Sequence, residues 1–110
     1  MKQGDIYWSD LNPTQGSEQA GVRPVVIVSG NAMNANFSVV IVCPVSSRIK
    51  HLPGCVVLNK DSINNLTSDS EVITFQIRAV TKQRLRGKLG EVTEEQLRKI
   101  RRGVDDILTY

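Results

Sequence analysis

An arginine stands where a glycine-rich loop runs into an apolar segment, a position that suits phosphate chemistry. Residues 16–22 are mainly glycine and polar side chains, and Arg23-Pro24 then leads into the apolar run 25–29. Proline fixes φ and lacks an N–H, so it is typical of the start of a strand, and it favours an extended Arg23. A guanidinium held beside a sheet can bind a phosphate through its planar fork of donors. The other reading is a surface hairpin loop whose arginine makes a structural ion pair.

The composition predicts one soluble globular domain over residues 1–110. Hydrophobic residues make up 40% of the chain and charged residues 23%, as in ordinary globular proteins, and the length suffices for one core. No apolar run reaches the roughly 18 to 20 residues that a transmembrane helix needs, and no signal-peptide core follows the N-terminus. We therefore expect a cytoplasmic protein.

The cysteines and the histidine do not predict a metal site. Cys43 and Cys55 lie in apolar runs without CxxC spacing, and His51 is alone. Reduced, buried thiols are the expected state in a cytoplasmic chain, and zinc finds no ligand set. We therefore expect neither a metal nor another cofactor.

Positive charge is concentrated late in the chain. Residues 78–102 hold nine Lys or Arg against three Glu, whereas the remainder carries a net charge of −3. This distribution favours a polyanion or an acidic protein as partner, or it is the solvated face of a helix and a neighbouring hairpin. With only five aromatic residues in the chain, base stacking cannot be the main binding device.

Hydrophobic periodicity predicts a mainly β domain that ends in a helix. We expect strands at 4–11, 25–29, 38–46, 55–58, 71–80 and 84–92, one helical turn within 30–36, and a mobile basic loop at 46–54. Thr93 and Gln96 then form a capping box, followed by apolar residues at helical spacing. Together these elements predict a strongly bent antiparallel sheet, a small barrel, closed by a C-terminal α-helix.

Four stretches together resemble the MazF/PemK (Kid-like) family of toxin endoribonucleases from bacterial toxin–antitoxin pairs. They are Gly-Asp-Ile-Tyr-Trp with Leu-Asn-Pro in 4–13, the loop and strand at 16–29, Val-Cys-Pro-Val-Ser-Ser at 42–47, and Gln-Ile-Arg with Lys-Gln-Arg-Leu in 76–85. The likeness covers nearly the whole chain in order. It implies an SH3-like barrel with a C-terminal helix that works as a homodimer.

The resemblance also implies an activity and its partners. Such an enzyme cleaves single-stranded RNA, often mRNA, at short sequences without a metal, and so inhibits translation and growth. Attack by the ribose 2′-hydroxyl would leave 2′,3′-cyclic phosphate and 5′-hydroxyl ends. A cognate antitoxin with an acidic or amphipathic tail would cover the RNA groove, and operator DNA would be bound only by the complex of toxin and antitoxin.

The family's catalytic arginine falls on Arg23, and its active-site threonine falls on Ser46, which keeps the hydroxyl. Some members carry an arginine and an aspartate where Ile73 and Phe75 stand, and neither of these side chains titrates. Glu18 is therefore the carboxylate left to act as the base. Its other role would be to order the loop through backbone N–H groups.

RNA contacts are expected from the loops and from the later strands. The predicted RNA-binding residues are Ser17 (histidine in some members), Gln19, Ser47, Arg48, Lys50, His51, Gln76, Arg78 and Arg84. The histidine titrates near neutral pH, but a flexible surface histidine is the alternative interpretation. The last arginine could equally serve a dimer or antitoxin interface.

Two rival functions stay open at this point. Gyrase-poisoning toxins of the CcdB type share this barrel but bind a protein and cut nothing. A catalytically weak family member that binds RNA or an antitoxin is the second rival, because Ile73 and Phe75 cannot transfer protons. The presence of Arg23 and Ser46 favours the nuclease, since a poison needs no phosphate site there.

Overall fold

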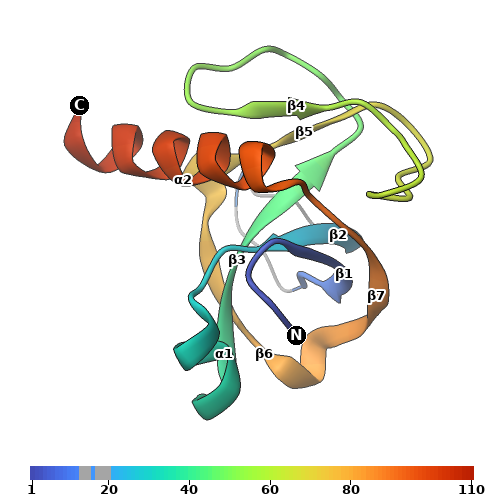
Figure 1. Cartoon of the computed structure of the whole chain (residues 1–110), viewed down its shortest axis with the longest axis vertical. Helices are drawn as coiled ribbons and strands as arrows, with labels where there is room; N and C mark the ends of the chain where they lie inside the picture. The colour runs from blue at the N-terminus through green and yellow to red at the C-terminus, as the bar shows by residue number, and fades with distance from the viewer. Residues whose placement is uncertain (13–15, 17–20) are drawn as a thin grey trace.

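The computed structural model describes residues 1–12, 16 and 21–110, and it shows an antiparallel sheet with a long C-terminal helix (Figure 1). The strands are β1 Asp5–Asp10, β2 Val22–Ile27, β3 Val39–Ser46, β4 Val56–Leu58, β5 Ser70–Val72, β6 Arg78–Thr81 and β7 Leu85–Glu91. The helices are α1 Asn31–Asn36 and α2 Glu94–Thr109, and two 3₁₀ turns are η1 Thr74–Gln76 and η2 Lys82–Arg84. The predicted mainly β architecture with a C-terminal helix is thus confirmed.

Strand β3 is the centre of the sheet. The strands run in the order β4-β5-β3-β2-β1-β7, and β6 pairs with β3 beside this path. Because β2 takes one edge of β3, β5 and β6 must share the other edge, β6 along residues 39–42 and β5 along residues 45–46. These pairings join neighbours along an open path, so the closure of a barrel stays a prediction.

The predicted continuous strand over residues 71–80 is wrong, and the register shows why. Val72 lies opposite Val45, and Arg78 lies opposite Val42. The five residues 73–77 therefore face only two residues of β3. The three extra residues cannot pair, and they form the 3₁₀ turn η1, which also ends the alternation of sides that a strand would have.

Strand β2 begins earlier than the sequence predicted. It starts at Val22, so Pro24 is its third residue and lies opposite Trp8 of β1. Arg23 is consequently a residue of the strand itself and does not stand at its entrance. Its backbone is held by the pairing of β1 with β2, which places Arg23 opposite Ser9.

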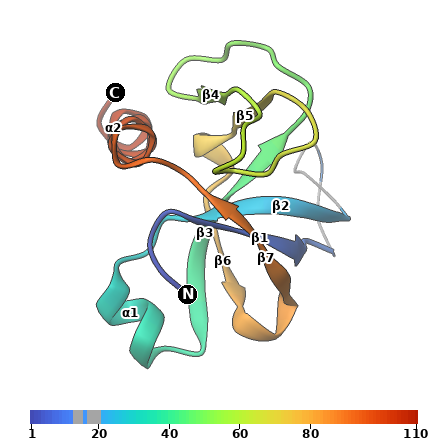
Figure 2. The same ribbon diagram turned by 45° about the vertical axis from the view of Figure 1, so that its right-hand side comes forward.

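Apolar side chains pack on both faces of the sheet. One cluster joins Val26, Val45 and Val72 to Ile100 of α2, and the other is built around Leu11, Val25 and Val42. Both views place α2 beside β4 and β5, while α1 lies near the opposite end of the sheet (Figure 2). Within the described residues, neither helix is long and apolar enough to cross a membrane.

The predicted capping box is confirmed, and of the two cysteines predicted to be buried, Cys43 is buried and Cys55 is partly exposed. The N–H of Gln96 donates to Oγ1 of Thr93 (3.1 Å), and the N–H of Thr93 donates to Oε1 of Gln96 (2.9 Å). Cys43 and Cys55 form no disulfide. Burial, with a smaller contribution from Cys55, raises the pKa of the Cys43 thiol to about 12, so this thiol is not a nucleophile at neutral pH.

Helix α2 presses directly on the segment that contains η1. Gly103 is buried, and a Cβ at this position would overlap the carbonyl oxygen of Gly54 and lie 3.2 Å from Cγ2 of Thr74. The Thr74 hydroxyl in turn donates to the Gly54 carbonyl (2.8 Å). Only a glycine lets the helix, the turn and the loop approach this closely.

We therefore predict that Gly103→Ala destabilises the fold. Overpacking of this kind costs about 1–3 kcal/mol, although alanine is the better helix former. Urea unfolding measures the effect, and Gly87→Ala is the matched control because nothing lies within 4 Å of a Cβ at that site. An unchanged urea midpoint for Gly103→Ala would contradict the close packing.

Candidate functional site

Polar residues from four adjacent strands form a row across one face of the sheet. Ser9 and Arg23 are paired between β1 and β2, and Ser46 and Glu71 are paired between β3 and β5. The last pair between β2 and β3 is Val25 with Pro44, so Arg23 and Ser46, each two residues beyond this pair, lie on the same side of their strands as Val25 and Pro44. Because opposed residues of antiparallel strands project to the same side, these four residues share one face, and we call them the polar row.

The polar row is unusually buried for its chemistry. Ser9 and Glu71 are 0% exposed and Ser46 is 4% exposed, whereas Arg23 is partly buried. The Ser9 hydroxyl is buried without a hydrogen-bond partner among the described residues. Burial of polar groups in a sheet costs free energy, so a row of them indicates a role other than packing.

Glu71 fixes the loop that follows β3. Its two carboxylate oxygens accept the backbone N–H groups of Lys50 and Leu52, each at 2.8 Å. The Ser46 hydroxyl accepts the N–H of Arg48 at 3.2 Å. The sequence predicted a mobile loop at 46–54 and gave Glu71 no role, but the structure ties this loop to the polar row at three points.

A cavity of about 380 Å³ opens beside Ser46. Four residues that were predicted for the site line it, namely Ser46, Arg48, Lys50 and Gln76. Its remaining lining residues are Leu52, Ile73 and Phe75. The structure thus brings together the Ser46 hydroxyl and the cations of Arg48 and Lys50. Ile73 and Phe75, where the sequence departs from the family pattern, lie beside them. We call this the cationic cavity.

Other predicted residues do not line the cationic cavity. Ser47 and His51 are exposed on the 47–54 loop. Arg78 donates from Nη1 to the Leu11 carbonyl (3.1 Å), and Arg84 donates to the Asn12 carbonyl (2.7 Å). These two arginines therefore hold the start of the loop that leads to Arg23. The predicted residues Ser17, Gln19 and Glu18 lie outside the described part of the chain.

The two ends of that loop are held together at a narrow neck. The Leu11 N–H donates to the Gly21 carbonyl (2.9 Å), and the Gly21 N–H donates to Oδ1 of Asn12 (3.1 Å). Asn12 is itself held by Asp10, whose Oδ1 accepts its N–H (3.0 Å). Arg23 follows the neck by two residues. Both ends of the loop are therefore held close to the polar row.

The basic residues of 78–102 are divided among several elements of the structure. Lys88 pairs with Asp5 at 3.4 Å, and the hydrogen bond that it donates to this carboxylate raises the pKa of Lys88. Arg86 lies 3.6 Å from Asp10, and Lys82 donates to the Asn34 carbonyl. The last four basic residues sit on α2, whereas the two cations of the cationic cavity come from the 47–54 loop.

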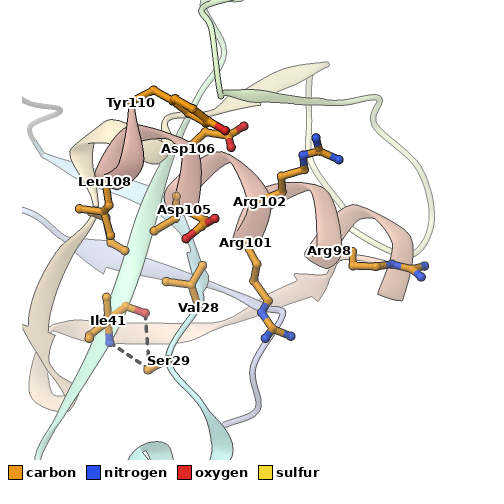
Figure 3. A pocket seen from close by; sticks show the side chains of 12 residues that line it. Val28, Ser29, Ile41, Arg98, Arg101, Arg102, Asp105, Asp106, Leu108 and Tyr110 are labelled. Atoms are coloured by element: carbon orange, nitrogen blue, oxygen red, sulfur yellow. Dashed lines mark hydrogen bonds between the residues drawn. The ribbon is translucent and has the colours of Figure 1, made fainter.

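A larger groove of about 880 Å³ lies between α2, the two residues that follow β2, and strand β3 (Figure 3). Arg98, Arg101 and Arg102 extend from the helix there, but Asp105 and Asp106 follow them on the next turn. This groove contains none of the residues that were predicted for the site. Its mixed charge also suits a polyanion less well than the cationic cavity does.

No metal site is apparent near either cavity. In the residues that the structure describes, no group of three His, Cys, Asp or Glu side chains is placed to hold a metal ion.

Glu71→Gln should loosen the 47–54 loop. The amide would turn an NH₂ group toward one backbone N–H and would lose the charge that strengthens both hydrogen bonds, which costs about 1–3 kcal/mol. Urea unfolding measures the stability, and amide exchange at Lys50 and Leu52 should become faster. Glu91→Gln is the matched control, because that strand carboxylate is 55% exposed. Unchanged exchange at both amides would show that Glu71 does not hold the loop.

Comparison with known proteins relates this arrangement to a family. The sequence model described as "PemK-like, MazF-like toxin of type II toxin-antitoxin system" matches residues 2–108. The chain is 36% identical over 107 residues to endoribonuclease MazF of Staphylococcus saprophyticus, an alignment that covers 96% of this chain and 88% of that protein.

Solved structures share the fold. MazF from Deinococcus radiodurans superposes with a TM-score of 0.86 at 27% identity, covering 100% of this chain and 97% of that one. A mycobacterial endoribonuclease in complex with its cognate antitoxin superposes with a TM-score of 0.81 at 28% identity, covering 98% and 94%. In sequence and in fold, then, the chain belongs to the PemK-like, MazF-like family of toxins of type II toxin–antitoxin systems.

Proposed function

We propose that this protein is a toxin endoribonuclease that cleaves single-stranded RNA, mRNA above all, at short sequences. Family membership and the 36% identical endoribonuclease MazF support this activity. The observation that carries the proposal is a cavity lined by Ser46, Arg48 and Lys50, with Arg23 on the same face of the sheet as Ser46. A hydroxyl and two cations, with a further arginine on the same face, suit a phosphodiester backbone.

The reaction needs no nucleophile from the protein, because RNA carries its own. The ribose 2′-oxygen forms a bond to the neighbouring phosphorus, and the bond from phosphorus to the 5′-oxygen breaks. The 2′-hydroxyl gives up its proton to a base, and the 5′-oxygen receives a proton from an acid, a role open to Arg23 or to water, so that a 2′,3′-cyclic phosphate and a 5′-hydroxyl result. The protein must hold the in-line geometry and stabilise the negative charge on the phosphoryl oxygens.

Arg23 and Ser46 provide that stabilisation. The guanidinium of Arg23 binds two phosphoryl oxygens with its fork of donors. The Ser46 oxygen already accepts the Arg48 N–H, so its own hydroxyl proton serves as the donor to the phosphate. Arg23 is therefore the charge stabiliser. Glu18 is the proposed base, since Ile73 and Phe75 cannot titrate.

The family also suggests the partners. The mycobacterial relative was solved with its cognate antitoxin, and we propose that a cognate antitoxin binds this chain with an acidic or amphipathic tail across the RNA groove. The active form is a homodimer of single-domain subunits with a closed SH3-like barrel. It works in the cytoplasm, where its cleavage of mRNA stops translation and growth, and operator DNA binds only the complex with antitoxin.

Arg23→Ala should abolish cleavage of a long single-stranded RNA incubated with the purified protein in EDTA. Loss of one preorganised donor of this kind lowers the rate by on the order of 10²–10³. Gel analysis follows the RNA, and end analysis should find cyclic phosphates. Arg98→Ala is the matched control, because this exposed arginine lies on α2 at the other groove, and it should cleave normally.

The same assay separates the rival functions. RNA left intact by the wild type, together with stalled gyrase, would replace the proposal with a gyrase poison. RNA left intact but retained on the protein would identify a family member without turnover.

Ser46→Ala should lower the cleavage rate, whereas Ser46→Thr should retain most of it. The alanine removes the hydroxyl donor, at a cost on the order of 10²–10³ in rate, but the threonine keeps it. Single-turnover rates on the same RNA measure both, with Ser62→Ala as a control at an exposed serine. Equal rates for the wild type and Ser46→Ala would remove Ser46 from the mechanism.

A further inference from the structure

A large apolar ring is exposed at the edge of the cationic cavity. Phe75 is 50% exposed, although a phenyl ring of this size normally stabilises a fold by being buried. It lines the same cavity as Ser46, Arg48 and Lys50. An exposed aromatic ring among cations and a hydroxyl is chemically suited to a ligand that is both flat and anionic.

The ring is held on a rigid support. Turn η1 carries it on the three residues that cannot pair with β3, and so projects it away from the ladder. The Ile77 N–H donates to the Thr74 carbonyl (3.3 Å), and the Thr74 hydroxyl donates to the Gly54 carbonyl (2.8 Å). Thr74 is 0% exposed. Because the backbone that carries Phe75 is held in this way, little backbone reordering is needed when a ligand binds to the ring.

The chemistry of the cavity selects the ligand. Single-stranded RNA presents unstacked bases, each with a flat π face, on a chain of phosphates. The aromatic face of Phe75 matches a base, and the two cations from the 47–54 loop match the flanking phosphates. Phe75 stands where some relatives carry an ionisable aspartate, so its role here is binding and not proton transfer.

We propose that Phe75 is a stacking platform and that the cationic cavity holds one nucleobase of the single-stranded RNA substrate. The subsite lies beside Ser46, so the stacked base belongs to a nucleotide next to the cleaved bond. The inference rests on the proposed function for the identity of the ligand. It adds a base-binding site that positions the RNA strand.

The test measures binding of RNA that cannot be cut. The probes are a fully 2′-O-methylated oligouridylate and a strand of the same length with abasic units, which keeps the phosphates but has no bases. Fluorescence anisotropy in EDTA at fixed salt gives the affinity of the wild type, Phe75→Ala and Phe75→Trp. Phe37→Ala is the matched control, since Phe37 is 55% exposed on the segment after α1 and away from the cavity.

Phe75→Ala should weaken binding of the oligouridylate roughly 5- to 150-fold, which corresponds to the 1–3 kcal/mol of a stacked base. Its affinity for the abasic strand should equal that of the wild type, because the phosphate contacts remain. Phe75→Trp should bind the oligouridylate at least as tightly as the wild type, and Phe37→Ala should change neither affinity. The urea midpoint of Phe75→Ala checks that the fold is kept.

Two results would overturn the inference. One is an unchanged affinity of Phe75→Ala for the oligouridylate while the wild type still cleaves RNA, which would leave the proposed function intact. The other is an equal loss for the base-bearing and abasic strands, because Phe75 would then not contact a base. If the wild type binds the oligouridylate through Phe75 but cuts no RNA, the proposed nuclease function is wrong and the base-binding subsite is retained.

Discussion

A buried carboxylate that is bound at both oxygens is the constraint on which the site depends. Glu71 is fully buried, and without the N–H groups of Lys50 and Leu52 its charge would be costly in that position. Glu71 is also the β5 residue that lies opposite Ser46 in the strand pairing. This one residue therefore connects β5, the end of β3 and the 47–54 loop. The loop that supplies Arg48 and Lys50 is thereby positioned by the same residue that stands next to the catalytic hydroxyl proposed here.

The rest of the site depends on a mismatch in length between β3 and the segment that pairs with its edge. Its free edge must accept both β5 and β6, and five residues of the connecting segment face only two residues of β3. The three extra residues form η1. Phe75 is half exposed on this turn, and Ile73, Phe75 and Gln76 all line the cationic cavity. Helix α2 then supports the turn from behind, where Gly103 lets the backbone of Gly54 approach. An aromatic ring can stay half exposed at position 75 because the turn holds it outside the core.

The basic residues that cluster late in the sequence have different roles in the structure. Arg78 and Arg84 bind carbonyl groups at the neck of the loop before Arg23, and Lys88 is paired with Asp5. The groove beside α2 is large, yet its three arginines are followed by Asp105 and Asp106 on the next turn of the helix (Figure 3). The smaller cationic cavity is therefore better suited to a phosphodiester than the larger groove, because the Ser46 hydroxyl and the cations of Arg48 and Lys50 line it together.

The sequence by itself determined the mainly β architecture, the capped C-terminal helix and the family, because these depend on hydrophobic periodicity, on the cap at Thr93 and on motifs read along the chain. It also pointed to Arg23 and Ser46. Only the tertiary structure decided that the segment 71–80 is broken, that Glu71 anchors a loop about twenty residues earlier in the chain, and that Arg78 and Arg84 support a loop neck. The physical reason is register. Which residues meet across β3 depends on how several strands share its two edges, and a single residue of shift would turn every side chain to the other face.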